Sequence, residues 1–304
     1  MKFQLIKFKS CDETALRYFV KFGFIIFENV FDSNAIDAAR SFFFRNFRYL
    51  EEKYKEGKIS KDVQGWSNAI IDAFSTSTTY NQLITSPNVI KILNPILGPD
   101  IAVLNFDHAW INTPSNTDPV LTKELHTDAW TGTSMNTVLA NTYITDVDEF
   151  NGLSVVPASH THGMTPVRNR RPDPSMTINY DLVNLTNLRA GDFILWHPLL
   201  LHSTTGNSDK NIRISISSRY TSTETPFSTQ ERALSYRTLS IGPMNQIARL
   251  VGNDYLTPYR TFGGTVGVER RLRHLYDLCD YTFSSESEPD YKKILDGIKG
   301  VDDA

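Results

Sequence analysis

The feature that most constrains the fold is a run of short β-rich segments that begins at Ile101. They are rich in β-branched and aromatic residues, are separated by turn residues, and cover 101–105, 110–112, 137–145, 153–156, 193–196 and 212–220. Short strands at close spacing are typical of a β-sandwich or β-barrel. The last segment alternates strictly, with Arg213, Ser215 and Ser217 on one face and isoleucines on the other. A polar face turned into the mouth of a barrel is suited to hold a polar ligand.

The first third of the chain is predicted to be helical with short strands. Residues 12–22 carry apolar side chains at helical spacing and precede Gly23, a typical helix end, and residues 24–30 follow as a buried strand. Further helices are predicted to begin near Asp32 or Ser33 and at Ser86-Pro87. We expect one domain over 1–304, with a helical flank over about 1–97, a β core over about 98–222 and a C-terminal helical extension over about 223–304.

Composition excludes several classes of partner. The 31 Lys and Arg against 34 Asp and Glu leave a charge of −3, which gives no field to attract nucleic acid or an anionic membrane. No apolar run approaches the roughly 18 residues of a membrane span, and the N-terminus does not resemble a signal peptide. Cys11 and Cys279 lie far apart and form no CxxC motif. We expect a cytoplasmic protein that binds a small-molecule substrate, in an oligomeric state that the sequence does not indicate.

Two segments carry residues that can bind a metal ion. His126 and Asp128 stand at i and i+2, and on a strand such residues project to the same side. A second histidine from the segment 191–204, with Arg213 nearby, would complete a 2-His-1-carboxylate face with an anion-binding arginine beside it. Residue chemistry alone leaves His197 and His202 as competing candidates, although His197 precedes a proline and suits a structural role at a strand end.

The order of the motifs resembles that of the phytanoyl-CoA dioxygenase family of Fe(II)/2-oxoglutarate-dependent oxygenases. The resemblance runs from about Leu16 to Tyr220. It includes, in the order of the family, FGFII at 22–26, LGPD at 97–100, HTD at 126–128, NGLSVVPASH at 151–160 and AGD at 190–192. The NGLSVVPASH turn departs from the family pattern because no residue separates Gly152 from Leu153 and because Ala158 replaces the usual glycine. Both departures affect loop geometry and not metal ligation.

The resemblance implies a mainly β protein with flanking helices, built on a cupin-like double-stranded β-helix, the jelly roll. It implies Fe(II) bound by His126, Asp128 and His202, because the second histidine of the family stands eleven residues before the arginine that binds 2-oxoglutarate, here Arg213. An arginine fork matches the distal carboxylate better than a lysine would.

Three further residues gain a role from the resemblance. Thr204, two residues beyond the second histidine, is implied to help seat 2-oxoglutarate. Asn141 and Tyr143 lie on one face of a strand that the resemblance places near the co-substrate. Asn141 is accordingly predicted to contact 2-oxoglutarate and Tyr143 the substrate, although buried polar side chains on a barrel strand also satisfy one another.

The implied reaction hydroxylates an unactivated C–H bond of a metabolite with O₂, while 2-oxoglutarate is decarboxylated to succinate and CO₂. A carboxylate at Asp128 favours hydroxylation or desaturation, because alanine or glycine there would free a coordination site for halide. Two alternatives stay open: a non-redox jelly roll that binds a sugar or metabolite, and a cupin-type metal isomerase. Arg213 counts against the isomerase, which has no co-substrate to anchor.

The segment 160–187 is long for a connection inside a compact domain and is predicted to form a lid. It concentrates basic side chains that could contact an anionic or strongly hydrogen-bonding substrate, namely Arg168, Arg170 and Arg171. The alternative is that these arginines are solvated surface charges. His160, in the PASH turn, is expected to be structural, and His108 and His162 have no partner visible in the sequence.

Overall fold

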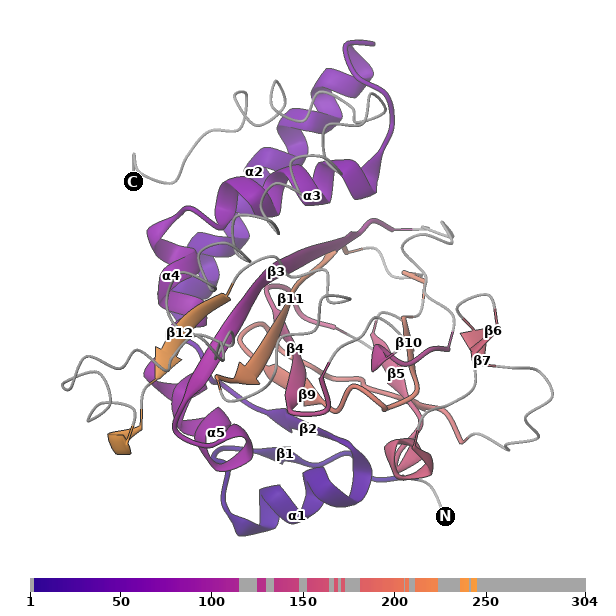
Figure 1. Cartoon of the computed structure of the whole chain (residues 1–304). Coiled ribbons are helices and arrows are strands. Elements are labelled where there is room, and N and C mark those ends of the chain that lie inside the picture. Colours follow the sequence, from indigo (N-terminus) through magenta and orange to yellow (C-terminus); the bar gives the residue numbers. More distant parts are fainter. Residues whose placement is uncertain are drawn as a thin grey trace, which may run out of the picture.

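A computed structural model describes residues 3–114, 125–129, 134–147, 152–163, 167–168, 171–172, 181–204, 206–207, 211–223, 236–240 and 242–244. The helices are α1 (Glu13–Phe22), α2 (Ser33–Lys55), α3 (Val63–Phe74), α4 (Thr78–Ile84), α5 (Pro87–Leu97) and the short 3-10 helix η2 (Ser159–His162) (Figure 1). The strands are β1 (Lys7–Phe8), β2 (Phe24–Phe27), β3 (Ile101–Asn112), β4 (Thr137–Tyr143), β5 (Leu153–Val155), β6 (Val167–Arg168), β7 (Arg171–Pro172), β8 (Val183–Asn184), β9 (Phe193–Trp196), β10 (His202–Thr204), β11 (Arg213–Ser222) and β12 (Tyr236–Ser240).

The helix boundaries follow from capping residues. The Asp12 carboxylate accepts a hydrogen bond from the Ala15 N–H at the start of α1, and Gly23 ends this helix in the left-handed region at φ 77°. Asp32 caps α2 in the same way. The predicted helix starts at Asp32 and at Ser86-Pro87 are confirmed. The sequence pattern did not predict α3 and α4 as separate helices.

Two β-sheets form the core of the fold. The larger has seven strands in the order β1-β2-β9-β4-β11-β3-β12, and the smaller has the order β10-β5-β8. Antiparallel pairing dominates both sheets, and the described strands form the predicted double-stranded β-helix. The separately predicted segments 101–105 and 110–112 are one continuous strand, β3, because β11 pairs with it along its length across one irregularity.

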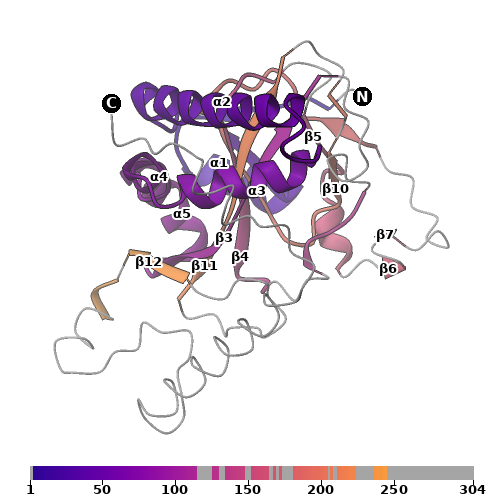
Figure 2. The same ribbon diagram turned by 90° about the horizontal axis from the view of Figure 1, so that it is seen from above.

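Near Arg213, the strands β11, β3 and β4 carry polar side chains on one face of the large sheet, as the alternation of 212–220 predicts. Arg213 pairs with Asn112, Ser215 with Tyr143, and Ser217 with Asn141. Paired residues on antiparallel strands project to the same side, so these polar side chains share the inner face. The isoleucines of β11 belong to the buried apolar core that also includes residues of α2 and α3. Figure 2 shows α2 and α3 lying across the sheet.

The C-terminal prediction is wrong for one segment. Tyr236–Ser240 was expected to belong to a helical extension, but it forms β12, which pairs antiparallel with β3. The free edge of β3 offers backbone donors and acceptors that an extended segment satisfies, and the local sequence does not reveal that edge. The rest of the predicted extension lies outside the described residues.

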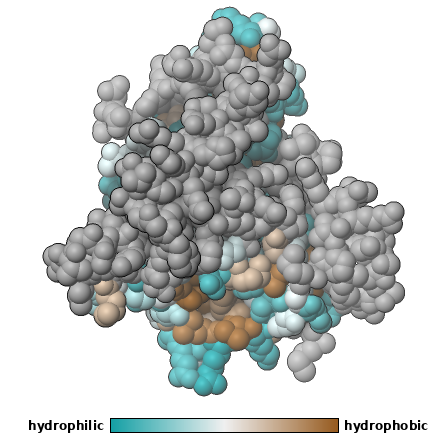
Figure 3. All heavy atoms as spheres, viewed as in Figure 1, coloured by the Kyte–Doolittle hydropathy of each residue, from teal (hydrophilic) through white to brown (hydrophobic). Residues whose placement is uncertain are grey.

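The described surface has a mixed character. Figure 3 shows hydrophilic residues over α1 at the lower end of this face and a hydrophobic patch just above them. Isolated apolar side chains such as Val20, 70% exposed on α1, are ordinary features of a protein surface.

Within the described ranges, no helix is both long and apolar enough to pass through a lipid bilayer.

Asp192 ties the N-terminal strand to the loop before β9. Its Oδ2 accepts hydrogen bonds from the Lys7 ammonium at 2.7 Å and from the Arg189 N–H at 2.9 Å, and the carboxylate is 1% exposed. The Asn29 N–H lies 3.4 Å from its Oδ1. This carboxylate therefore satisfies donors from three separate segments at one end of the large sheet.

Replacing Asp192 with alanine should lower the free energy of unfolding by about 2 to 4 kcal/mol, somewhat less than for a wholly buried pair because Lys7 stays partly in water. Urea unfolding of the metal-free protein measures this. Glu51→Ala, which removes an exposed ion pair with Lys55, is the control and should change stability by no more than about 0.5 kcal/mol. Equal effects of the two substitutions would show that Asp192 does not hold these segments together.

Candidate functional site

The fold brings His126, Asp128 and His202 together, although they are distant in sequence. One ligand atom from each lies within 4.8 Å of the others. Asp128 Oδ1 is 4.0 Å from His126 Nε2, and Asp128 Oδ2 is 3.4 Å from His202 Nε2. His202 is buried, while the other two side chains are slightly exposed. Two imidazole nitrogens and one carboxylate oxygen at this spacing form a donor set suited to one transition-metal ion.

Backbone hydrogen bonds place the donor set. His126 and His202 donate their N–H groups to each other's carbonyl oxygens, both at 2.9 Å, so the segment carrying His126 extends the small sheet beside β10. The N–H groups of Asp128 and Ala129 both donate to the Pro198 carbonyl, at 3.0 and 3.1 Å. The carboxylate is therefore fixed relative to the β9–β10 turn.

The orientation of the His202 ring follows from its other nitrogen. His202 Nδ1 lies 3.0 Å from the Leu200 carbonyl oxygen, which can only accept a hydrogen bond, so we assign the proton to Nδ1. Nε2, which lies 3.4 Å from Asp128 Oδ2, is then the ring nitrogen that can bind a metal. A carbonyl that holds the second nitrogen is the usual arrangement around a metal-binding histidine.

His197 is not part of this donor set. Its Nδ1 accepts a hydrogen bond from the Leu199 N–H at 3.1 Å, and its ring centroid lies 5.6 Å from that of His160. Burial, together with the neighbouring His160, lowers the pKa of His197 to about 4. Of the two histidines that residue chemistry left open, the structure brings His202 to His126 and Asp128.

Arg213 is a buried cation without a hydrogen-bonded anion among the described residues. Its side chain is 2% exposed, and Nε and Nη1 have no hydrogen-bond partner there. Burial lowers the pKa of the guanidinium, and nearby Tyr143 acts in the opposite direction. Arginine nevertheless keeps its charge in proteins, so its burial is favourable only if an anion joins it.

Tyr143 and Asn141 lie beside this arginine. Burial raises the pKa of the Tyr143 hydroxyl, while Arg213, the Asn141 side chain and the Leu153 backbone act to lower it. The tyrosine therefore interacts with both sheets, because Arg213 and Asn141 belong to the large sheet and Leu153 belongs to the small one. The Asn141 Oδ1 is buried without a partner in the described structure.

The sequence did not single out two polar side chains at this site. Asn112 pairs in register with Arg213, is 1% exposed, and has no partner for either amide atom within the described ranges. Trp196 Nε1 is likewise buried and unbonded there, and its ring centroid is 5.5 Å from that of His202. Both residues end predicted strands, but only the cross-strand register reveals that they face the site.

Of the remaining predicted site residues, the structure describes the Thr204 side chain but not the side chains of the three arginines. Thr204 is half-buried on β10, two residues from His202, and pairs with Leu153. Arg168 and Arg171 pair in the hairpin of β6 and β7, but their side chains, and Arg170 altogether, lie outside the described part. Residues 164–166, 169–170 and 173–180 of the proposed lid also lie outside the described part.

The PASH turn contacts the first helix. His160 Nε2 lies 3.0 Å from the Val20 carbonyl oxygen of α1, so the imidazole donates this hydrogen bond. The ring occupies the space where a Cβ on Gly23 would lie. The expected structural role of His160 agrees with these contacts.

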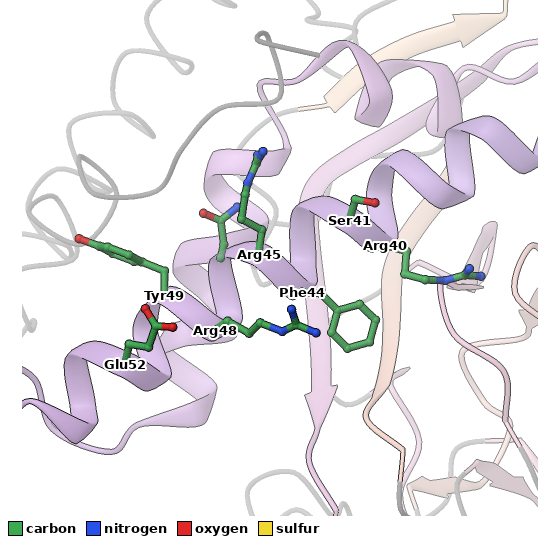
Figure 4. A pocket seen from close by; sticks show the side chains of 8 residues that line it. Arg40, Ser41, Phe44, Arg45, Arg48, Tyr49 and Glu52 are labelled. Atoms are coloured by element: carbon green, nitrogen blue, oxygen red, sulfur yellow. The ribbon is translucent and has the colours of Figure 1, made fainter.

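A separate groove follows the outer face of α2 (Figure 4). It has a volume of about 610 Å³ and is lined by Arg40, Ser41, Phe44, Arg45, Asn46, Arg48, Tyr49 and Glu52. Arg40 in this groove already donates to the Ile144 carbonyl and pairs with Asp37. None of the predicted site residues lines the groove, so it is distinct from the His-Asp-His site.

Comparison with solved structures finds similar folds at low sequence identity. The epimerase SnoN in complex with Fe³⁺, α-ketoglutarate and nogalamycin RO is 20% identical, with a TM-score of 0.54 over 76% of this chain and 90% of that one. The non-heme monooxygenase ThoJ in its apo form is 14% identical, with a TM-score of 0.55 over 86% and 98% of the two chains. EctD from S. alaskensis with bound Fe is 14% identical, with a TM-score of 0.53 over 71% and 79%.

Comparison with curated protein sequences gives no match. The family model "Phytanoyl-CoA dioxygenase (PhyH)", in contrast, matches residues 19–215, more than half of the chain. This range begins in the last turn of α1 and contains the His-Asp-His donor set and Arg213, in the order that the resemblance in the sequence indicated. The chain therefore belongs to the phytanoyl-CoA dioxygenase family.

Proposed function

We propose that the protein is an Fe(II)- and 2-oxoglutarate-dependent dioxygenase that hydroxylates an unactivated C–H bond of a small metabolite. One observation carries the proposal: a 2-His-1-carboxylate donor set shares the interior of the double-stranded β-helix with a buried arginine whose Nε and Nη1 are unbonded within the described residues. The donor set suits ferrous iron with open coordination positions. The arginine suits the distal carboxylate of 2-oxoglutarate.

The residues fit both groups. His126, Asp128 and His202 would hold iron, and their backbone hydrogen bonds keep the three donors on one side. Bound iron and 2-oxoglutarate together supply O₂ activation coupled to decarboxylation of 2-oxoglutarate to succinate and CO₂.

The task of Arg213 is to bind and orient the co-substrate. Its unbonded N–H groups can form paired hydrogen bonds with a carboxylate, which offsets the cost of burying the guanidinium. Thr204 and Asn141 are proposed to assist. The Asn141 amide N–H can donate to an oxygen of the co-substrate, whereas its unbonded Oδ1 can only accept from a donor group. Fixed donors of this kind orient a reactant without reorganisation during the reaction.

The similar structures support the cofactors more than the reaction. Two of them contain bound iron, and one of these also contains α-ketoglutarate, but the first is an epimerase and the second is EctD. Hydroxylation is proposed here because Asp128 supplies a carboxylate that leaves no ligand position for a halide. Tyr143 and the arginines at 168, 170 and 171 stay predicted substrate contacts, and the substrate itself stays unnamed.

Replacing His126, Asp128 or His202 with alanine should abolish succinate formation from 2-oxoglutarate, and loss of either histidine should sharply weaken metal binding. Anaerobic calorimetry with Fe(II) and a succinate assay measure the two effects. His162→Ala, at an exposed histidine, is the matched control and should bind iron like the unmodified protein. Full binding by His202→Ala, with complete loss in His197→Ala, would show that His197 is the second histidine ligand.

Arg213→Ala should weaken 2-oxoglutarate binding at least tens-fold, because losing one partner of a buried charge pair costs about 2 to 5 kcal/mol. Iron affinity should change little, since Arg213 is not a metal ligand. Arg189→Ala, which removes an exposed arginine paired with Asp146, is the control. Unchanged 2-oxoglutarate affinity in folded Arg213→Ala protein would remove the co-substrate assignment, and turnover without any 2-oxo acid would favour the isomerase alternative.

A further inference from the structure

The turn 197–200, between β9 and β10, contacts both sides of the His-Asp-His site through its carbonyl groups. The Pro198 carbonyl accepts hydrogen bonds from the N–H groups of Asp128 and Ala129. The Leu200 carbonyl accepts the hydrogen bond of His202 Nδ1 at 3.0 Å. The position of Asp128 and the ring orientation of His202 therefore both depend on the conformation of one short turn.

The His197 side chain fixes this turn from within. Its Nδ1 accepts the Leu199 N–H at 3.1 Å, and its carbonyl accepts the Leu200 N–H at 2.9 Å. A side-chain acceptor that binds the N–H two residues ahead is the arrangement that asparagine and aspartate form in Asx turns. Pro198 favours the backbone conformation of this turn, and His197 supplies its side-chain acceptor, since no Asn or Asp stands at these positions.

The surroundings of His197 hold its ring in place and keep Nδ1 able to accept. The His197 N–H donates to the Gly23 carbonyl at 2.9 Å, which ties the end of β9 to the end of α1. The neighbouring ring of His160 is held by the Val20 carbonyl. Because burial and His160 lower the pKa of His197 to about 4, the imidazole is neutral near pH 7.

We propose that His197 is a positioning residue of the metal centre. Its Nδ1 holds the Leu199 N–H so that the carbonyls of Pro198 and Leu200 keep Asp128 and His202 in the geometry that binds the metal. This inference rests on the proposed iron site and adds a residue that is not itself a ligand. A purely packing role for the half-buried ring is the alternative.

Two substitutions separate the alternatives. His197→Asn keeps an acceptor for the N–H two residues ahead but loses the ring, whereas His197→Phe keeps a ring of similar bulk but loses the acceptor. If the acceptor matters, asparagine should preserve the turn and phenylalanine should not. If packing matters, the order should reverse. His162→Phe, at an exposed position of η2, controls for a histidine-to-phenylalanine change.

The first measurement uses metal-free protein, so it does not depend on the proposed function. NMR-detected hydrogen exchange of the Leu199, Asp128 and Ala129 amides should become about 2- to 10-fold faster in His197→Phe, the range expected for one lost hydrogen bond. In His197→Asn and in His162→Phe these amides should exchange as in the unmodified protein. Unchanged exchange in His197→Phe would overturn the proposal.

The second measurement is anaerobic calorimetry with Fe(II). His197→Phe should bind iron roughly 10-fold more weakly. Substitutions of residues that hydrogen-bond to metal ligands weaken metal binding by at least about this factor, and His197→Asn should restore the affinity. Weaker binding by asparagine than by phenylalanine would instead support packing and overturn the proposal. Failure of the unmodified protein to bind iron would refute the proposed function, while the exchange result would still decide whether His197 holds the turn.

Discussion

The site depends on the pair of backbone hydrogen bonds between His126 and His202. These two bonds attach the segment 125–129 to the edge of β10 and bring two of the three metal donors together. Asp128 then follows two residues later, with its N–H fixed by the Pro198 carbonyl. The rigid double-stranded β-helix thus prepares the metal site before a metal binds.

Electrostatics supports the proposal that 2-oxoglutarate binds beside the metal site. The inner face of the large sheet carries Arg213, whose burial is costly without an anion. Tyr143 is buried next to it and is held in the neutral form by that burial, so it does not supply the missing charge. A dicarboxylate that reaches from the metal to the guanidinium would satisfy both the open metal positions and the buried cation. We therefore propose that the metal donors and the arginine form one binding site.

Local sequence patterns predicted the elements whose causes are local. Asp12, Gly23 and Asp32 mark helix ends by capping, and the alternation around Arg213 identified the polar inner face. The continuity of β3, the addition of β12 and the inward position of Asn112 depend on cross-strand pairing, which no local pattern encodes. The choice of His202 over His197 came from the family resemblance, and the geometry brings the same histidine to the donor set.

We propose that the distal carboxylate of 2-oxoglutarate neutralises the buried charge of Arg213. Anaerobic calorimetry on the Fe(II)-loaded protein can compare 2-oxoglutarate with 2-oxovalerate, which has the same 2-oxo acid group and chain length but no distal carboxylate. We expect 2-oxoglutarate to bind at least tens-fold more tightly, in line with the value of a desolvated charge pair. Equal affinities for the two acids would contradict it.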